Sequence, residues 1–194
     1  MKDINAIAVF CGSKAGASPA YEASARELGG AMAEKGIRLV FGGGRIGIMG
    51  FVADEVLSGG GEVTGVIPHF LHDLEVGHDG VTELIAVESM HERKNAMFMR
   101  SDAFVILPGG LGTLDECLEI ITWKQLQLHA KPIVILDVDG YWKTLRTLIE
   151  GVIDGGFAHP KARDLFVIVS SVDEIFTAIA NAPEPDREVL EDHL

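Results

Sequence analysis

Short apolar runs alternate with longer amphipathic stretches along this chain, and no other feature constrains its fold as strongly. The runs are rich in Val, Ile, Leu and Phe, a composition typical of strands that are buried on both faces of a parallel sheet. We predict strands over residues 4–10, 38–41, 62–67, 103–107, 132–136 and 165–169. Because helical patterns separate most of them, the sequence predicts an α/β fold, a single Rossmann-like, doubly wound parallel sheet with helices on both faces.

Capping residues mark where several helices begin. Ser18 and Pro19 suit the N-cap and the first position of a helix. Ser89 and Glu92 have the capping-box spacing and predict a helix to about Arg100. The predicted helices cover residues 19–35, about 47–57, 90–100, 113–128, 141–153 and a last segment after 170, whereas residues 68–88 are less regular. We expect one domain over residues 1–182, followed by an acidic, flexible tail over 183–194.

The overall charge and the cysteine count restrict the partners and the compartment. The 194 residues carry a net charge of −13, which argues against nucleic acids and anionic membranes because both require a basic surface. Only two cysteines, Cys11 and Cys117, are present, so a disulfide framework is excluded and a reducing compartment is indicated. No apolar run reaches membrane-spanning length, and the first residues have no signal-peptide layout. We therefore expect a cytoplasmic protein.

A glycine-rich turn joins the predicted strand at 103–107 to the next helical pattern. It reads Pro-Gly-Gly-Leu-Gly-Thr-Leu-Asp-Glu over residues 108–116. In parallel α/β sheets such turns lie at the carboxyl edge of the sheet, where ligands bind. Glycine leaves the backbone N–H groups uncovered, and the helix that follows adds its own unpaired amides. The stretch therefore predicts an anion-binding turn, and similar turns at 11–16 and 42–50 support it.

Thr113 and Glu116 allow two interpretations of the end of this turn. Thr-x-x-Glu before an apolar run is the capping-box pattern, with Thr113 as the N-cap and Glu116 three residues later. In the first interpretation Glu116 only caps a helix. In the second, its carboxylate lies at the rim of a phosphate-sized cradle. The spacing alone does not separate the two.

Two adjacent cations, Arg93 and Lys94, fall in the first turns of a predicted helix, where the helix dipole disfavours positive charge. They form either a solvated surface pair or a pair that shares a bound anion. Together with Arg45 they are the candidate cations for a phosphate.

Three histidines, His69, His72 and His78, occur in the irregular stretch. Their spacing is not diagnostic of a metal site, so we expect solvated loop side chains and no metal.

Two motifs at this separation resemble those of the LOG (Lonely Guy) family of cytokinin-activating phosphoribohydrolases. They are Met90-His91-x-Arg93-Lys94 and Pro108-Gly109-Gly110-x-Gly112-Thr113-x-x-Glu116. The resemblance covers most of the chain, from the turn at 11–13 to the turn at 137–141. Members of the family often carry the label lysine decarboxylase. Nothing in this sequence marks a Schiff-base lysine for pyridoxal phosphate.

The resemblance implies hydrolysis of the N-glycosidic bond of adenosine 5′-monophosphate or an N6-substituted analogue, which gives a free base (adenine or a cytokinin) and ribose 5-phosphate. It implies that Arg93 and Glu116 are catalytic. Substrate contacts carry over onto Glu75, Arg93, Lys94, Gly110, Leu111, Gly112, Thr113, Leu114, Asp115, Glu116 and Thr122. Asp115 stands where many relatives have glutamate and keeps the carboxylate. The resemblance also implies a homodimer built on helices near the site, and neither a metal nor another cofactor.

Two other classes of protein share glycine-rich turns. A non-catalytic nucleotide- or cofactor-binding carrier or sensor of the same fold would tolerate the loss of a carboxylate, so the presence of both Glu116 and Arg93 argues against it. A dinucleotide oxidoreductase would have a compact Gly-x-Gly-x-x-Gly after the first strand, whereas this chain has Cys-Gly-Ser-Lys-Ala-Gly. The chemistry also favours a hydrolase, because a departing purine leaves positive charge on the sugar that a carboxylate stabilises.

Overall fold

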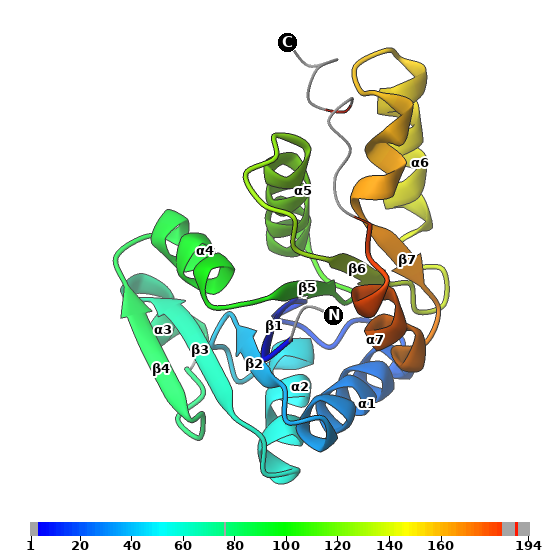
Figure 1. The fold of residues 1–194 in the computed structure, drawn as a ribbon. Coiled ribbons are helices and arrows are strands. Elements are labelled where there is room, and N and C mark those ends of the chain that lie inside the picture. The colour runs from blue at the N-terminus through cyan, green and yellow to red at the C-terminus, as the bar shows by residue number, and fades with distance from the viewer. Residues whose placement is uncertain (1–3, 76, 184–188, 190–194) are drawn as a thin grey trace.

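A computed structural model describes residues 4–75, 77–183 and 189, and Figure 1 shows how their helices and strands are arranged. Strands and helices alternate over most of the chain. In chain order the elements are β1 (Ala6–Phe10), α1 (Pro19–Glu34), β2 (Arg38–Phe41), α2 (Gly47–Ser58), β3 (Val63–Pro68), α3 (His69–Glu75), β4 (Glu83–Val87), α4 (Met90–Met99), β5 (Ala103–Ile106), α5 (Leu111–Gln125), β6 (Ile133–Leu136), α6 (Lys143–Asp154), the 3₁₀ helix η1 (Pro160–Leu165), β7 (Val167–Val169) and α7 (Val172–Ala180).

The strands form one sheet in the order β4-β3-β2-β1-β5-β6-β7. Every pairing between these strands is parallel. β1 lies between β2 and β5, and Ile7 is in register with Leu39 on one side and Ala103 on the other. The chain therefore winds outward from β1 to β4, returns to β5 and winds outward again to β7. The direction reverses beside β1, and in open α/β sheets ligands bind at such a reversal.

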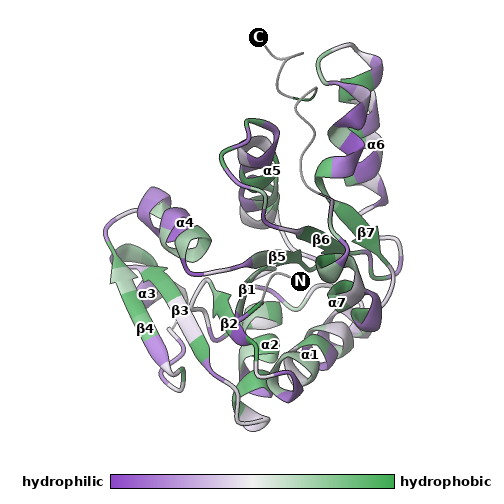
Figure 2. Cartoon of the chain, in the orientation of Figure 1, coloured by the Kyte–Doolittle hydropathy of each residue, from purple (hydrophilic) through white to green (hydrophobic). Residues whose placement is uncertain are grey.

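Helices cover both faces of the sheet (Figure 1). Alternate side chains of β1 point to opposite faces, so Ile7 and Val9 belong to one apolar cluster and Ala8 and Phe10 to another. The first cluster takes residues from α1, α2 and α7, and the second from α4, α5 and α6. Figure 2 shows β5, β6 and β7 as hydrophobic and more hydrophilic residues on α4 and α6. This arrangement confirms the predicted doubly wound α/β fold.

The irregular stretch is where the prediction from sequence was incomplete. Residues 68–88 contain α3 and the edge strand β4, which pairs with β3 from Glu83 to Val87. The apolar strand runs predict the other strands well because those strands are buried. β4 also has an apolar run, from Leu84 to Val87, but the run follows a glutamate within the irregular stretch, and its residues are only partly buried at the edge of the sheet.

Two predicted N-caps are confirmed, and the last helix begins after residue 170 as predicted. Ser18 Oγ accepts a hydrogen bond from Ala20 N, and Ser89 Oγ accepts one from Glu92 N. Ser171 and Glu174 form a complete capping box at the start of α7.

The last segment is described only in part. Most of the predicted tail over 183–194 lies outside the described residues, so the domain limits stay a prediction; Val189, which is described, is buried in the cluster that includes α5 and α6. Among the described residues, no helix has the length and apolar character needed to span a membrane.

Candidate active site

The turns after β1 and β5 lie side by side where the winding of the sheet reverses. Gly12 N donates to Pro108 O over 3.0 Å, and Leu107 N donates to Phe10 O over 3.0 Å. A cavity of about 190 Å³ opens at these turns. It is lined by Val9, Cys11, Gly12, Ser13, Gly42, Met49, Met90, Arg93, Met97, Gly110, Leu111, Gly112, Thr113 and Glu116. We call it the Glu116 cavity.

The predicted cap at Thr113 is wrong. α5 begins at Leu111 with Gly110 as its N-cap, and no side chain accepts a capping hydrogen bond there. Thr113 is therefore the third helical residue, and Glu116 lies in the second turn. The Thr-x-x-Glu spacing occurs one turn inside the helix, because glycine can take the N-cap position itself. Glu116 does not cap the helix, which leaves its carboxyl group available to the cavity.

Two kinds of glycine shape the start of α5. A Cβ on Gly109 would lie 2.1 Å from Thr113 Oγ1, so this position needs glycine for close packing of the turn. A Cβ on Gly110 or Gly112 would meet no atom of the described protein within 4 Å. The first helical bond at this end joins Leu114 N to Gly110 O. The amides of Leu111, Gly112 and Thr113 precede it and are the unpaired donors that suit an anion.

Glu116 is buried, with 8% of its surface exposed. Burial raises the pKa of its carboxyl group from 4.5 to about 7, and the nearby guanidinium of Arg93 opposes that rise. At neutral pH the group is therefore present both as an acid and as a carboxylate. Such a perturbed carboxyl in a cavity is typical of a catalytic site.

Arg93 reaches the same cavity from α4. Its Nε donates to Val66 O over 3.0 Å, and its Nη2 donates to Gly42 O over 2.6 Å. The guanidinium is thus held by the carboxyl ends of β3 and β2 and is buried. A Cβ on Gly42 would lie 2.0 Å from Nη2, so only glycine permits this approach.

Lys94 points elsewhere. Its Nζ contacts Asp115 Oδ2 at 3.1 Å and Glu119 Oε1 at 3.0 Å, which joins α4 to α5. Neighbouring helix residues project about 100° apart, so Arg93 and Lys94 face different groups. The interpretation as a solvated surface pair is therefore wrong, because Arg93 is buried; a shared anion is not tested.

The other predicted substrate contacts are spread over the site and its surroundings. Gly110, Leu111, Gly112, Thr113 and Glu116 line the cavity. Leu114 packs against the core cluster that includes α5, and Asp115 pairs with Lys94. Thr122 is exposed and donates to Leu118 O, while Glu75 ends α3. Arg45 is exposed in the turn before α2.

Sequence reasoning missed several lining residues. Cys11 and Ser13 belong to the turn after β1, so their position at the carboxyl edge was available from the pattern. The cavity is also lined by Met49, Met90 and Met97, and the spacing of these residues in the sequence does not predict this position. Both cysteines are free thiols in the interior. Burial raises the pKa of the Cys117 thiol to about 12 and raises that of Cys11 as well, so neither is poised as a nucleophile.

A second cavity of about 350 Å³ adjoins the first and shares Gly12, Ser13 and Gly110 with it. Tyr21 and Tyr141 form part of its wall, and Tyr141 Oη donates to Gly109 O over 2.5 Å. The two cavities together extend the site along the turns after β1, β5 and β6.

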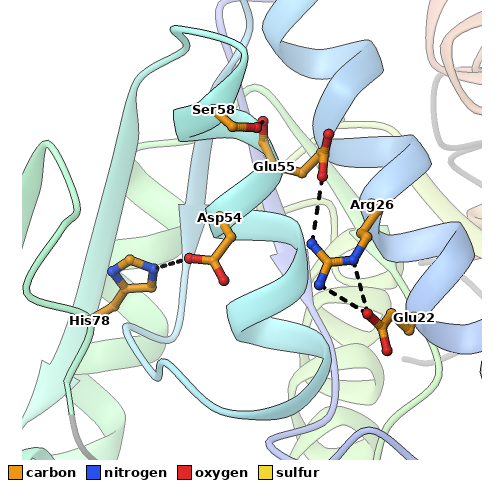
Figure 3. Close-up of polar contacts among 6 residues, drawn as sticks. All are labelled: Glu22, Arg26, Asp54, Glu55, Ser58 and His78. Atoms are coloured by element: carbon orange, nitrogen blue, oxygen red, sulfur yellow. Dashed lines mark hydrogen bonds and ion pairs between the residues drawn. The ribbon is translucent and has the colours of Figure 1, made fainter.

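The histidines that we predicted to be solvated lie in different surroundings. Among the described residues, no group of three or more His, Cys, Asp or Glu side chains is placed to hold a metal ion. His69 is exposed near Glu88. His78, in contrast, is buried, and its Nε2 lies 2.9 Å from Asp54 Oδ1 (Figure 3), so the prediction of a solvated side chain is wrong there.

Comparison with known proteins identifies relatives over most of the chain. The family model described as "Possible lysine decarboxylase" matches residues 49–179. Cytokinin riboside 5′-monophosphate phosphoribohydrolase LOG7 of Arabidopsis thaliana is 46% identical over 169 residues, which cover 87% of this chain and 78% of the relative. LOG1 of the same plant is also 46% identical over 169 residues, covering 87% and 79%.

Solved structures share the fold at lower identity. The molybdenum cofactor binding protein from Rippkaea orientalis superposes with a TM-score of 0.71 at 22% identity, covering 93% of this chain and 98% of that one. The Moco carrier protein from Chlamydomonas reinhardtii gives 0.70 at 23% identity with the same coverage. At such identities the likeness supports the Rossmann-like fold alone. By the family model and the identities of about 45%, this chain belongs to the LOG family, whose model bears the description "Possible lysine decarboxylase".

Proposed function

We propose that this protein hydrolyses the N-glycosidic bond of adenosine 5′-monophosphate or an N6-substituted analogue, and releases the free base and ribose 5-phosphate. The observation that carries the proposal is the buried carboxyl group of Glu116 beside Arg93, in a cavity that opens at the N-terminus of α5. The relatives named above are phosphoribohydrolases of cytokinin riboside 5′-monophosphates.

The phosphate would bind at the start of α5. The amides of Leu111, Gly112 and Thr113 point out of the helix end, where the helix dipole favours negative charge. The space next to Gly110 and Gly112 is open, as a bound phosphate requires. Lys94 would affect phosphate binding at the start of α5 only indirectly, because its charge is already paired with Asp115 and Glu119.

Glu116 would act on the sugar. Departure of the base gives the ribose ring the character of an oxocarbenium ion, and a carboxylate nearby stabilises that positive charge. As the C1′–N bond breaks, water forms the new C1′–O bond and loses one proton. Glu116 can accept that proton, and the leaving base gains one. A carboxyl group with a pKa of about 7 exchanges protons readily at neutral pH.

Arg93 would set the charge state of Glu116 and complete the cavity wall. It lowers the pKa of the carboxyl group against the effect of burial. Two of its donors are already satisfied by Val66 O and Gly42 O, so its orientation is fixed before the substrate binds. Such preorganisation reduces the reorganisation needed at the transition state.

The rival function, a carrier or sensor, has no need for this carboxyl group. Burying it lowers the stability of the folded state, and a binding protein would gain nothing in return. The hydrolase is therefore favoured by the site itself as well as by the relatives.

We also infer that the protein is a cytoplasmic homodimer. The resemblance is the ground for the dimer, and the two interior thiols fit a reducing compartment. Glu75 and Thr122 stay proposed substrate contacts on the same ground. Light scattering on the purified protein would test the dimer, since a monomeric mass would contradict it.

The decisive test incubates the protein with a panel of nucleoside 5′-monophosphates and separates the free bases. We expect adenine or its N6-substituted form to appear without an added cofactor. Glu116→Gln and Arg93→Ala should abolish turnover, and Glu116→Gln should still bind nucleotide. Glu27→Gln, a change on the exposed side of α1, serves as the matched control. Full activity in Glu116→Gln would refute the assigned role.

A further inference from the structure

Arg93 is held by a turn that has no side chains of its own. Its Nη2 donates to the carbonyl of Gly42, the first of three consecutive glycines after β2. Gly43 has φ +78°, a conformation that glycine adopts without strain. Three glycines in a row lose much conformational entropy on folding. Contacts from outside the turn therefore have to fix its shape.

The connection between α3 and β4 supplies these contacts. His78 N donates to Gly43 O over 2.9 Å. Gly44 and Gly77 form an isolated antiparallel bridge next to it. The backbone of residues 77–78 thus lies along the glycine turn like a short strand. These contacts support the shape of the turn.

The side chain of His78 fixes the segment to the body of the protein. Its Nδ1 accepts a hydrogen bond from Gly80 N, so Nε2 carries the hydrogen and donates to Asp54 Oδ1 on α2. The ring also meets Phe41 at the end of β2 edge-on, with 6.5 Å between the ring centroids. Figure 3 shows Asp54 turned toward His78. One buried ring therefore joins α2, β2 and its own loop.

We propose that His78 is a positioning residue for the hydrolysis proposed above. With Asp54 it holds the turn of residues 42–44 in the place where the Gly42 carbonyl receives Arg93. The inference rests on the proposed function, because the role of His78 acts through Arg93. His78 lines neither of the two cavities at the site.

Loss of this anchor has a specific consequence at Glu116. The charged groups that act on its carboxyl group are Arg93, Asp115, Lys94 and Glu119. Of these, only Arg93 is bonded to the glycine turn; Lys94 pairs with carboxylates on α5. A loosened turn should weaken the effect of Arg93 alone. The pKa of Glu116 should then rise, while the start of α5 and its phosphate cradle stay unchanged.

The experiment compares four variants in the full-length protein. His78→Ala and Asp54→Ala remove the anchor, whereas Asp54→Asn keeps an oxygen that accepts from Nε2. Glu55→Gln is the control: it also removes one carboxylate from α2, but Glu55 faces Arg26 on α1 (Figure 3). The measurements are kcat, KM, their pH profiles and a ¹³C NMR titration of the Glu116 carboxyl group.

We expect kcat to fall by about tenfold or more in His78→Ala and Asp54→Ala, with a smaller change in KM. The pKa of Glu116 should rise in both. Asp54→Asn and Glu55→Gln should behave like the wild type. Asp54 is half-exposed, so Asp54→Ala tests the proposal even if His78→Ala does not fold. An unchanged Glu116 titration in Asp54→Ala would overturn the inference, whatever happens to the activity.

Failure of the proposed function would give a different result. The wild type would then release no base from any nucleotide of the panel, and the NMR titration of Glu116 would still report whether His78 and Asp54 position Arg93.

Discussion

Replacing Glu116 with Gln should make the protein more stable at pH 8 while it abolishes turnover. Burial raises the pKa of this carboxyl group from 4.5 to about 7, so the folded protein binds the proton more tightly than the unfolded chain does. A raised pKa favours the folded state below pH 4.5, and this contribution is lost as the pH rises toward 7. Gln has nearly the same shape and never ionises, so the variant does not lose it.

The size of the effect follows from the pKa values. At about 1.36 kcal/mol per pH unit, the rise from 4.5 to about 7 corresponds to about 3 kcal/mol at pH 8. For a domain of this size, 1 kcal/mol shifts the melting temperature by roughly 2–4 °C, so the variant should melt roughly 6–12 °C higher. At pH 4 the wild-type group is protonated in both states, and the two proteins should differ by less than about 1 kcal/mol.

Urea unfolding at pH 4, 6 and 8 measures this difference directly, with thermal melts as a second readout. Glu27→Gln, on the exposed side of α1, controls for the loss of one negative charge from a chain of net charge −13 and should change stability by less than about 0.5 kcal/mol. If Glu116→Gln is no more stable than the wild type at pH 8, the carboxylate is well accommodated in the folded state. That outcome would refute the link between the burial of Glu116 and its raised pKa.

Two further substitutions test the surroundings of Glu116. In Gly42→Ala the new Cβ would lie 2.0 Å from Arg93 Nη2, so the guanidinium has to move. Turnover should fall roughly a hundredfold in steady-state assays, and near-normal turnover would contradict the assigned position of Arg93. Lys94→Met removes two ion pairs between α4 and α5, and the lysine side chain is only 15% exposed, so stability should fall by about 1–3 kcal/mol in urea unfolding. Because Lys94 lowers the pKa of Glu116, the acid limb of the pH–rate profile should move to higher pH in this variant, and an unmoved limb would show that its charge does not reach the site.

Burial explains which parts of the fold could be predicted from the sequence. The strands β1, β2, β5 and β6 are four or five residues long and buried almost throughout, so their apolar runs were sufficient. β4 has a run of the same length, Leu84 to Val87, but it lies at the sheet edge with its residues partly exposed, so an apolar run alone did not separate this strand from the irregular stretch around it. The position of the candidate cavity could also be predicted, because parallel strands bring their carboxyl ends to one edge.

The orientation of individual side chains was beyond the reach of sequence spacing. Thr113 and Glu116 match a capping box, yet the helix starts two residues before Thr113, since Gly110 serves as the N-cap. His78 reads as a polar loop residue, and only the fold brings Asp54 from α2 close enough to satisfy it in the interior. For Glu116, the N-cap is a glycine, a residue type that the capping-box pattern does not include. For His78, the partner lies on α2, an element that the sequence around His78 does not specify.

Arg93 and Lys94 are neighbours in the sequence, but the fold gives them separate partners and separate roles. As neighbours in a helix they project in directions about 100° apart, so a pair of cations need not serve one anion. Lys94 pairs with Asp115 and Glu119 on α5. Arg93 faces inward, where it counters the burial of Glu116. Without Lys94, the two carboxylates on α5 would raise the pKa of Glu116 further. The ion pairs of Lys94 with Asp115 and Glu119 therefore help to hold the pKa of Glu116 at the value that Arg93 sets. Both cations act on the same carboxyl group without sharing a ligand.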